Sequence, residues 1–119
     1  MEHRCAERVK SELKILIYKH NHPVAIGRIN NGSRHGVFVE TDFMDIDCEH
    51  QLKLEVMLSK NNYSKFKRIE MEAIVIHKTP RGFGAEIEFP NTQQADMFME
   101  IMRGAKKDII EEPVLALVV

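Results

Sequence analysis

The chain has 119 residues, with 17 Lys and Arg against 18 Asp and Glu, and a formal net charge of −1. A chain of this length forms one domain that buries a core without disulfide or metal staples. The near-neutral balance argues against a general DNA or RNA binder, because affinity for the phosphate backbone is built on clustered positive charge. No apolar run approaches the ~20 residues of a membrane-spanning helix, and the charged start does not resemble a signal peptide. We therefore expect a cytoplasmic protein without membrane insertion.

The first eight residues carry charge but no core-forming pattern, and they include two arginines, Arg4 and Arg8. A guanidinium offers a planar fork to phosphate oxygens and a flat face that stacks on a nucleotide base. We expect residues 1–8, called the arm below, to be a flexible segment that closes over an anionic ligand.

Alternating apolar residues predict β-strands through most of the chain. In residues 9–20, for example, Leu13, Ile15 and Ile17 share one face. The further predicted strands cover residues 24–29, 36–40, 52–58, 69–76 and 83–89, with breaks at 21–23, 30–33 and 79–82. Six consecutive antiparallel strands with short turns predict a small closed β-barrel.

A helix is predicted after the last strand. Asn91 is its expected N-cap, with Gln94 as the reciprocal capping-box partner, and Phe98 and Met102 lie on its apolar stripe. The barrel and helix together occupy residues 9–105. Residues 106–119 form a tail that ends in six apolar residues, 114–119. This run either packs on its own barrel or adds to a sheet edge or groove of another chain, and we favour a homodimer through the tail.

A second polar signature, Asn31-Gly32-Ser33 followed by Gly36, lies between the second and third predicted strands. Asn-Gly between two apolar runs is the strongest short hairpin signal, so a tight turn alone explains Asn31 and Gly32. It does not explain a hydroxyl at 33 and a residue without Cβ at 36, where a flat ligand would press on the backbone.

The two signatures, Arg4-x-x-x-Arg8 and Asn31-x-Ser33-x-x-Gly36, resemble those of the PilZ domain family, bacterial receptors for cyclic di-GMP. Chance predicts roughly 0.02 occurrences of the second pattern in a chain of this composition. The resemblance extends from residue 1 to about residue 103. It implies a mainly β fold, a six-stranded antiparallel barrel with a C-terminal α-helix.

The resemblance also implies a function and a binding site. The function is a cyclic di-GMP receptor and adaptor, which changes its contact with an effector protein when the arm closes over the ligand. In the site, the two arginines would contact guanine and phosphates, the asparagine a guanine edge and the serine a phosphate or base, while the glycine leaves room. The implied ligand-binding residues are Arg4, Arg8, Asn31, Ser33, Arg34 and Gly36. Two alternatives stay open: a PilZ-like interaction module that binds no nucleotide, and a small-barrel nucleic-acid binder.

The sequence offers no catalytic or metal-binding constellation. The carboxylates from Asp42 to Glu49 invite a calcium loop, but counting from Asp45 puts His50 where glycine is needed and Val56 where glutamate is needed. The histidines and two cysteines lack metal-site spacings, and we expect the cysteines to be free thiols. We therefore expect no metal, no cofactor and no enzymatic activity.

Overall fold

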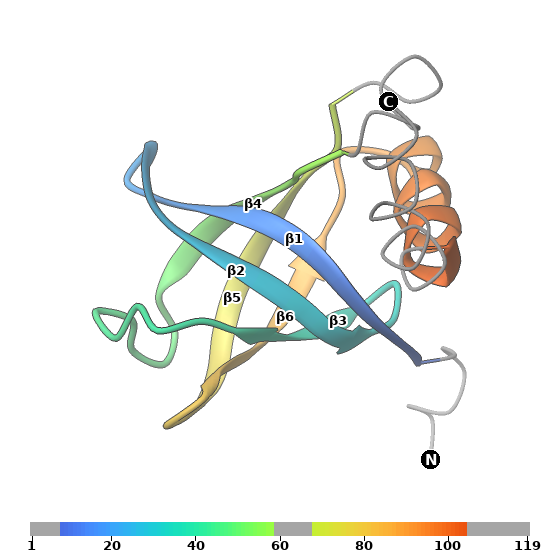
Figure 1. The fold of residues 1–119 in the computed structure, drawn as a ribbon. Helices are drawn as coiled ribbons and strands as arrows, with labels where there is room; N and C mark the ends of the chain where they lie inside the picture. The colour runs from blue at the N-terminus through green and yellow to red at the C-terminus, as the bar shows by residue number, and fades with distance from the viewer. Residues whose placement is uncertain (1–7, 59–67, 105–119) are drawn as a thin grey trace, which may run out of the picture.

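The computed structural model describes residues 8–58 and 68–104. Most of the arm, with Arg4, and the whole tail lie outside the described residues. The six strands close into an antiparallel barrel in the order β1-β2-β3-β6-β5-β4, as predicted (Figure 1). Their bounds differ from the predicted ones by at most three residues: β1 (Val9–Lys19), β2 (His22–Gly32), β3 (Gly36–Glu40), β4 (Gln51–Val56), β5 (Glu70–Thr79) and β6 (Gly82–Glu88).

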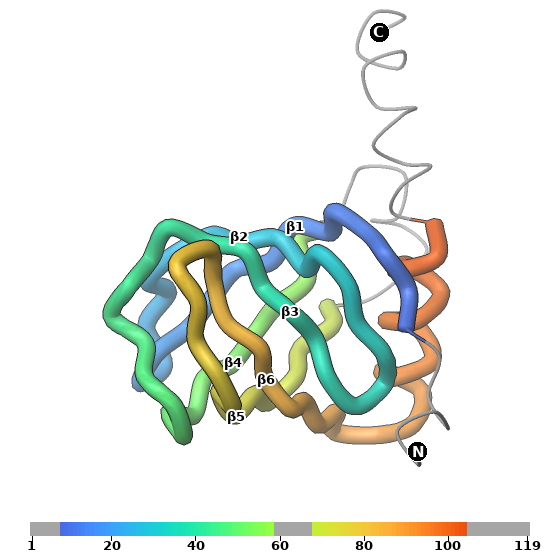
Figure 2. Tube along the Cα trace, turned by 90° about the horizontal axis from the view of Figure 1, so that it is seen from below, coloured from blue at the N-terminus to red at the C-terminus, as the bar shows by residue number. Residues whose placement is uncertain are grey.

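Alternate residues of each strand form the core of the barrel. On β1, Ile15 and Ile17 are fully buried, and their neighbours in sequence point outward. A helix that begins at residue 92 covers one end of the barrel (Figure 2). It contributes Phe98 and Met102 to the core, each with no exposed surface, and the ring of Phe98 lies 5.2 Å from that of Phe89. The helix therefore completes the core and is not a separate unit.

The turn between β1 and β2 consists of His20 and Asn21. Both have positive φ, 53° and 66°, as the two central residues of a type I′ hairpin turn require. β2 then starts at His22, and Pro23 pairs with Tyr18. The predicted break at residues 21–23 therefore lies too late in the chain.

The interpretation of Asn31-Gly32 as a turn is wrong. Both residues belong to β2, where Gly32 pairs with Val9 on one side and Val37 on the other. No glycine in the described ranges has a positive φ, so Gly32 does not supply a left-handed turn conformation. A Cβ at Gly32 would lie 2.7 Å from Cγ1 of Val37. Glycine is needed here for close packing, and the turn itself is formed by residues 33–35.

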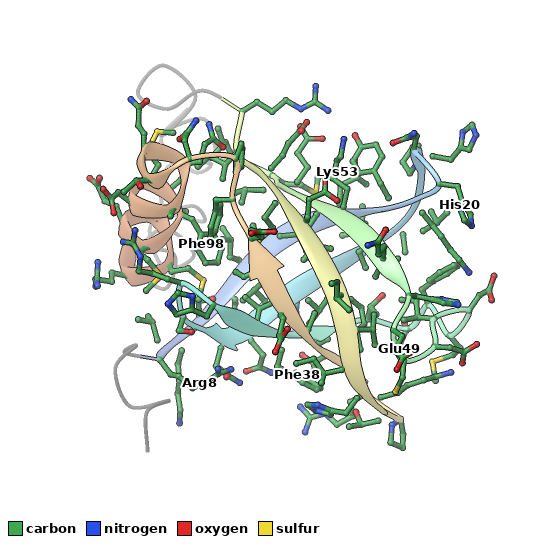
Figure 3. All side chains as sticks on the ribbon, turned by 180° about the vertical axis from the view of Figure 1, so that it is seen from behind. Arg8, His20, Phe38, Glu49, Lys53 and Phe98 are labelled. Atoms are coloured by element: carbon green, nitrogen blue, oxygen red, sulfur yellow. The ribbon has the colours of Figure 1, made fainter. Side chains whose placement is uncertain are left out.

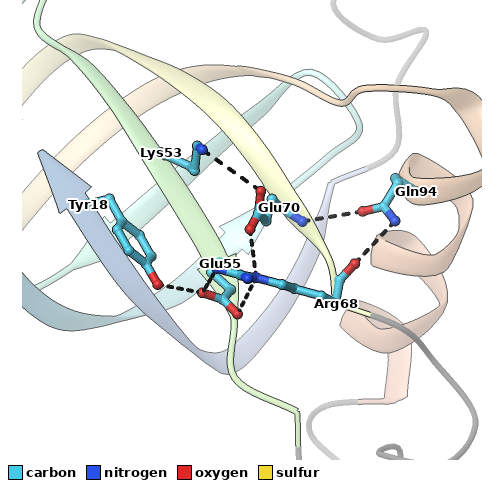
Figure 4. A network of polar contacts seen from close by, with 6 residues as sticks. All are labelled: Tyr18, Lys53, Glu55, Arg68, Glu70 and Gln94. Atoms are coloured by element: carbon cyan, nitrogen blue, oxygen red, sulfur yellow. Dashed lines mark hydrogen bonds and ion pairs between the residues drawn. The ribbon is translucent and has the colours of Figure 1, made fainter. Parts of the chain in front are cut away.

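The helix N-cap is confirmed, but its capping box is not. Oδ1 of Asn91 accepts a hydrogen bond of 2.8 Å from the backbone N–H of Gln94. The Gln94 side chain turns toward the start of β5 instead of back to Asn91. Its Oε1 accepts from the N–H of Glu70 at 3.3 Å, and its Nε2 donates to the carbonyl of Arg68 at 3.2 Å (Figure 4). The amide thereby joins the helix to β5.

Candidate functional site

Arg8 and Asn31 meet at the end of the barrel where β1 begins. Arg8 immediately precedes Val9, which pairs with Gly32, so the register brings the end of the arm beside the second signature. Nε of Arg8 donates to Oδ1 of Asn31 at 3.0 Å, and Nη2 donates to the same oxygen. Arg8 points outward from this end of the barrel, where a ligand can reach it (Figure 3).

Gly36 lies beside the same guanidinium. It is the first residue of β3 and pairs with Glu86 of β6. A Cβ on Gly36 would lie 3.8 Å from Nη1 of Arg8 and 3.4 Å from the carbonyl oxygen of Ala85. Arg8, Asn31 and Gly36 therefore form one continuous surface, contributed by β2, β3 and the residue that precedes β1.

Ser33 shapes the turn that leads to Gly36. It is only 4% exposed, and its Oγ accepts hydrogen bonds from the N–H groups of His35 at 3.2 Å and Gly36 at 3.3 Å. Its own N–H donates to the carbonyl of Gly36 at 2.8 Å. These bonds fix where the backbone of Gly36 lies. A direct contact between Ser33 and a ligand stays a prediction.

Arg34 is directed toward the helix. Its Nη1 lies 2.6 Å from Oδ1 of Asp96, which makes a charge-assisted hydrogen bond between the turn and the helix. Arg34 is therefore not gathered with Arg8 and Asn31, although it precedes Gly36 by two residues. Arg4 lies outside the described residues, so the structure does not place it.

One residue outside the predicted set lies beside this site: Lys10 pairs with Asn31 across β1 and β2. The strand alternation places Lys10 on the outer face, so its position could be read from the sequence. Lys10 and Arg28 also line a hollow of about 320 Å³ on these strands, together with the carboxylates of Glu12 and Glu40. The hollow has no excess of positive charge, so it does not extend the candidate site.

A separate polar network joins β1, β4 and β5 (Figure 4). Nε of Arg68 lies 2.8 Å from Oε2 of Glu55 and 2.6 Å from Oε2 of Glu70, and the hydroxyl of Tyr18 donates to Oε1 of Glu55 at 2.8 Å. The hydrogen bond to the Glu55 carboxylate raises the pKa of Tyr18, and the same carboxylate raises that of Arg68. The geometry is that of a structural brace between strands.

The acidic loop between β3 and β4 is tied to the barrel by lysines. Nζ of Lys19 lies 3.1 Å from Oδ2 of Asp45, and Nζ of Lys78 lies 3.5 Å from Oδ1 of Asp47. Within the described ranges, no group of three or more His, Cys, Asp or Glu side chains is placed to hold a metal ion. No helix in that part of the chain is long and apolar enough to cross a membrane.

Comparison with known proteins gave matches among solved structures alone: no family model and no curated protein matches the sequence. The Bacillus subtilis inhibitor of motility MotI/DgrA superposes with a TM-score of 0.65 at 18% identity, over 86% of this chain and 50% of that one. This chain thus spans half the length of MotI/DgrA. The PilZ domain of CeSA from a cellulose-synthesizing bacterium superposes with a TM-score of 0.61 at 12% identity, over 82% of this chain and 96% of that domain. The barrel and helix described above therefore have the fold of a PilZ domain.

Proposed function

We infer that this protein is a receptor for cyclic di-GMP that acts as an adaptor on an effector protein. The observation that carries this inference is the contact of Arg8 with both Asn31 and Gly36, since it joins the two sequence signatures at one surface. The PilZ-domain fold supports it. The ligand's two guanines and two phosphates match what this surface offers, namely a guanidinium, an amide and basic neighbours.

Binding exchanges one set of hydrogen bonds for another. Without ligand, two N–H groups of Arg8 share the single Oδ1 of Asn31. With ligand, the guanidinium turns to guanine O6 and N7 or to a phosphate, and the Asn31 amide is released to a guanine edge. Gly36 presents bare backbone on which a base can lie, and Arg4 closes over the ligand with the rest of the arm.

Isothermal titration of cyclic di-GMP into the wild type, Arg8→Ala and Arg81→Ala tests this proposal. Arg81 is the matched control, because it is also an exposed arginine bonded to a strand residue, with Nη2 2.8 Å from Oε2 of Glu40. Glu40 lies at the opposite end of β3 from Gly36. We expect Arg8→Ala to abolish binding with little change in the thermal midpoint, and Arg81→Ala to bind as the wild type does.

Wild-type affinity in Arg8→Ala would overturn the assignment of the site. A folded wild type that does not bind cyclic di-GMP would instead favour the interaction module without a nucleotide. Binding of single-stranded oligonucleotides in place of the dinucleotide would favour the nucleic-acid binder.

A further inference from the structure

A hollow of about 700 Å³ lies between the β2–β3 turn, the outer face of β5 and β6, and the first turn of the helix. Figure 3 looks onto these two strands with the helix beside them. Ile74, 43% exposed, gives the hollow an apolar surface, and three carboxylates line it, those of Glu72, Glu86 and Glu88. It has the size of a binding pocket and combines apolar with charged groups.

The carboxylates are arranged unfavourably for the free protein. Glu72 and Glu88 are direct partners across β5 and β6, and Glu86 is the partner of Ile74. Like charges directly opposite each other on neighbouring strands destabilise a sheet. Among the described residues, none of the three carboxylates forms an ion pair, and Arg34 is the one lysine or arginine that lines the hollow. Glu72 faces Lys53 of β4 on its other side, but the strand partners of Glu86 are Gly36 and Ile74 and that of Glu88 is Glu72. Glu86 and Glu88 therefore have no cation opposite them on the neighbouring strands.

We propose that the hollow docks a short segment of a partner protein that carries basic side chains around an apolar one. The apolar side chain covers Ile74, which is exposed to water when no partner is bound. The lysines or arginines pair with the carboxylates of Glu86 and Glu88 and relieve the repulsion between Glu72 and Glu88. A nucleic acid is the wrong occupant, because its phosphates carry the same sign of charge as the lining.

Arg34 makes the docking responsive to ligand, a step that rests on the proposed function. It belongs to the turn that holds Gly36, it lines the hollow, and it pairs with Asp96 of the helix at 2.6 Å. Gly36 of the candidate site is two residues from Arg34, so a ligand phosphate bound beside Gly36 draws Arg34 away from Asp96. The hollow then loses its cation and the Asp96 carboxylate becomes free. Both changes favour a basic segment, so cyclic di-GMP raises the affinity for the partner.

The docking is tested without ligand by fluorescence anisotropy, with a labelled peptide of alternating Lys and Leu as the probe. The test variant is Glu86→Gln with Glu88→Gln, which also removes the repulsion from Glu72 and so does not threaten folding. The matched control is Glu12→Gln with Asp42→Asn, two exposed carboxylates elsewhere on the surface, with the same change in net charge. We expect about tenfold weaker binding in the test variant and a change within about twofold in the control. Equal weakening in both would mean non-specific attraction and would overturn the proposal.

The coupling is tested by Arg34→Gln. We expect the probe to bind this variant about three- to tenfold more tightly than the wild type, and cyclic di-GMP to add nothing further. If cyclic di-GMP still strengthened probe binding in the variant, the role of Arg34 would be overturned. A wild type that bound the probe but not cyclic di-GMP would overturn the proposed function and the coupling together, while the docking would stand on its own variants.

Two further experiments test other possible occupants of the hollow. If Lys106→Gln with Lys107→Gln in the full chain raised the affinity for the probe, the hollow would belong to the chain's own tail. If light scattering showed self-association that Glu86→Gln with Glu88→Gln abolished, it would belong to a second copy. Either result would overturn docking of a partner's segment.

Discussion

The ring of His77 faces the ring of Phe38 from two strands away, with the centroids 6.2 Å apart and 27° between the planes. Gly84 of β6 lies between them, paired with Phe38 on one side and His77 on the other. A Cβ on Gly84 would collide with the imidazole of His77. The absent side chain on β6 is therefore what lets these two rings meet on the outside of the barrel.

The atoms around Gly84 and Gly82 of β6 predict a small loss of stability when the first is replaced by alanine and a large loss when the second is. In Gly84→Ala the exposed His77 ring can swing into solvent, so we expect a loss of less than about 1.5 kcal/mol, the worth of the ring contact. In Gly82→Ala the new Cβ collides with the backbone carbonyl of Val39, which cannot move aside. We expect that variant to lose more than about 3 kcal/mol or to fail to fold. Urea unfolding measures both; equal losses would contradict the account.

Gly36→Ala separates ligand binding from folding. Its Cβ would make an ordinary contact of 3.4 Å with the carbonyl of Ala85, so stability should hold. The methyl would occupy the surface beside Nη1 of Arg8, where a base is expected to lie, and weaken cyclic di-GMP about tenfold or more. Gly104→Ala is the control, since nothing lies within 4 Å of a Cβ there. Titration calorimetry and thermal unfolding give the two readouts, and an unchanged affinity in Gly36→Ala would remove this glycine from the site.

Gln94→Ala tests the link between the helix and β5. The variant loses an acceptor for the N–H of Glu70 and a donor for the carbonyl of Arg68, so we expect a loss of about 1–2 kcal/mol. Amide exchange at Glu70 should also become faster. Gln93→Ala removes the same side chain from a neighbouring exposed position and should cost about 0.5 kcal/mol or less. If the two variants had the same stability, the side-chain bonds of Gln94 would not hold the helix to the barrel.

Tyr18 predicts a loss of stability at alkaline pH. Its hydrogen bond to the Glu55 carboxylate raises the pKa of its phenol in the folded state. The folded protein therefore holds this proton more tightly than the unfolded chain does. The resulting stability is fully present below the unfolded pKa near 10 and is lost as the pH rises through the folded value.

Denaturation midpoints of the wild type and Tyr18→Phe, measured from pH 8 to pH 11, test this sign. The difference between the two proteins should be constant up to about pH 10 and shrink above it. A difference that grew with pH would mean that ionisation of Tyr18 is easier in the folded state, and would contradict the hydrogen bond to Glu55.

The sequence predicted the barrel well because burial there has a period of two residues. β3 was also predicted with its observed bounds, because its apolar run of residues 37–39 lies between Gly36 and Glu40. The errors came from rules that consider only near neighbours. Asn31-Gly32 has the composition of a turn, but pairing on both sides and the close approach of Val37 place it within β2.

In the candidate site, too, some contacts could be predicted from the sequence and others could not. The spacing of the signatures correctly suggested that Arg8 and Asn31 belong together, and the register of β1 with β2 puts them in contact. The partner of Arg34 was not predictable, because Asp96 is 62 positions away in sequence and no local pattern links the two. Gln94 likewise lies at the capping-box position after Asn91, but its side chain bonds the backbone of Arg68 and Glu70 at the start of β5 instead.

The position of Asn31 within a strand divides the site into a part that can be redesigned and a part that cannot. Residues 33–35 connect β2 to β3, and a different loop there would keep Asn31 in place, because its register is set by Lys10 and Phe38. The amide is thus a fixed anchor, and Ser33 must also stay, because its hydrogen bonds position Gly36. A library that varies residues 34 and 35 would therefore change what the anchor presents to a ligand without asking the barrel to refold.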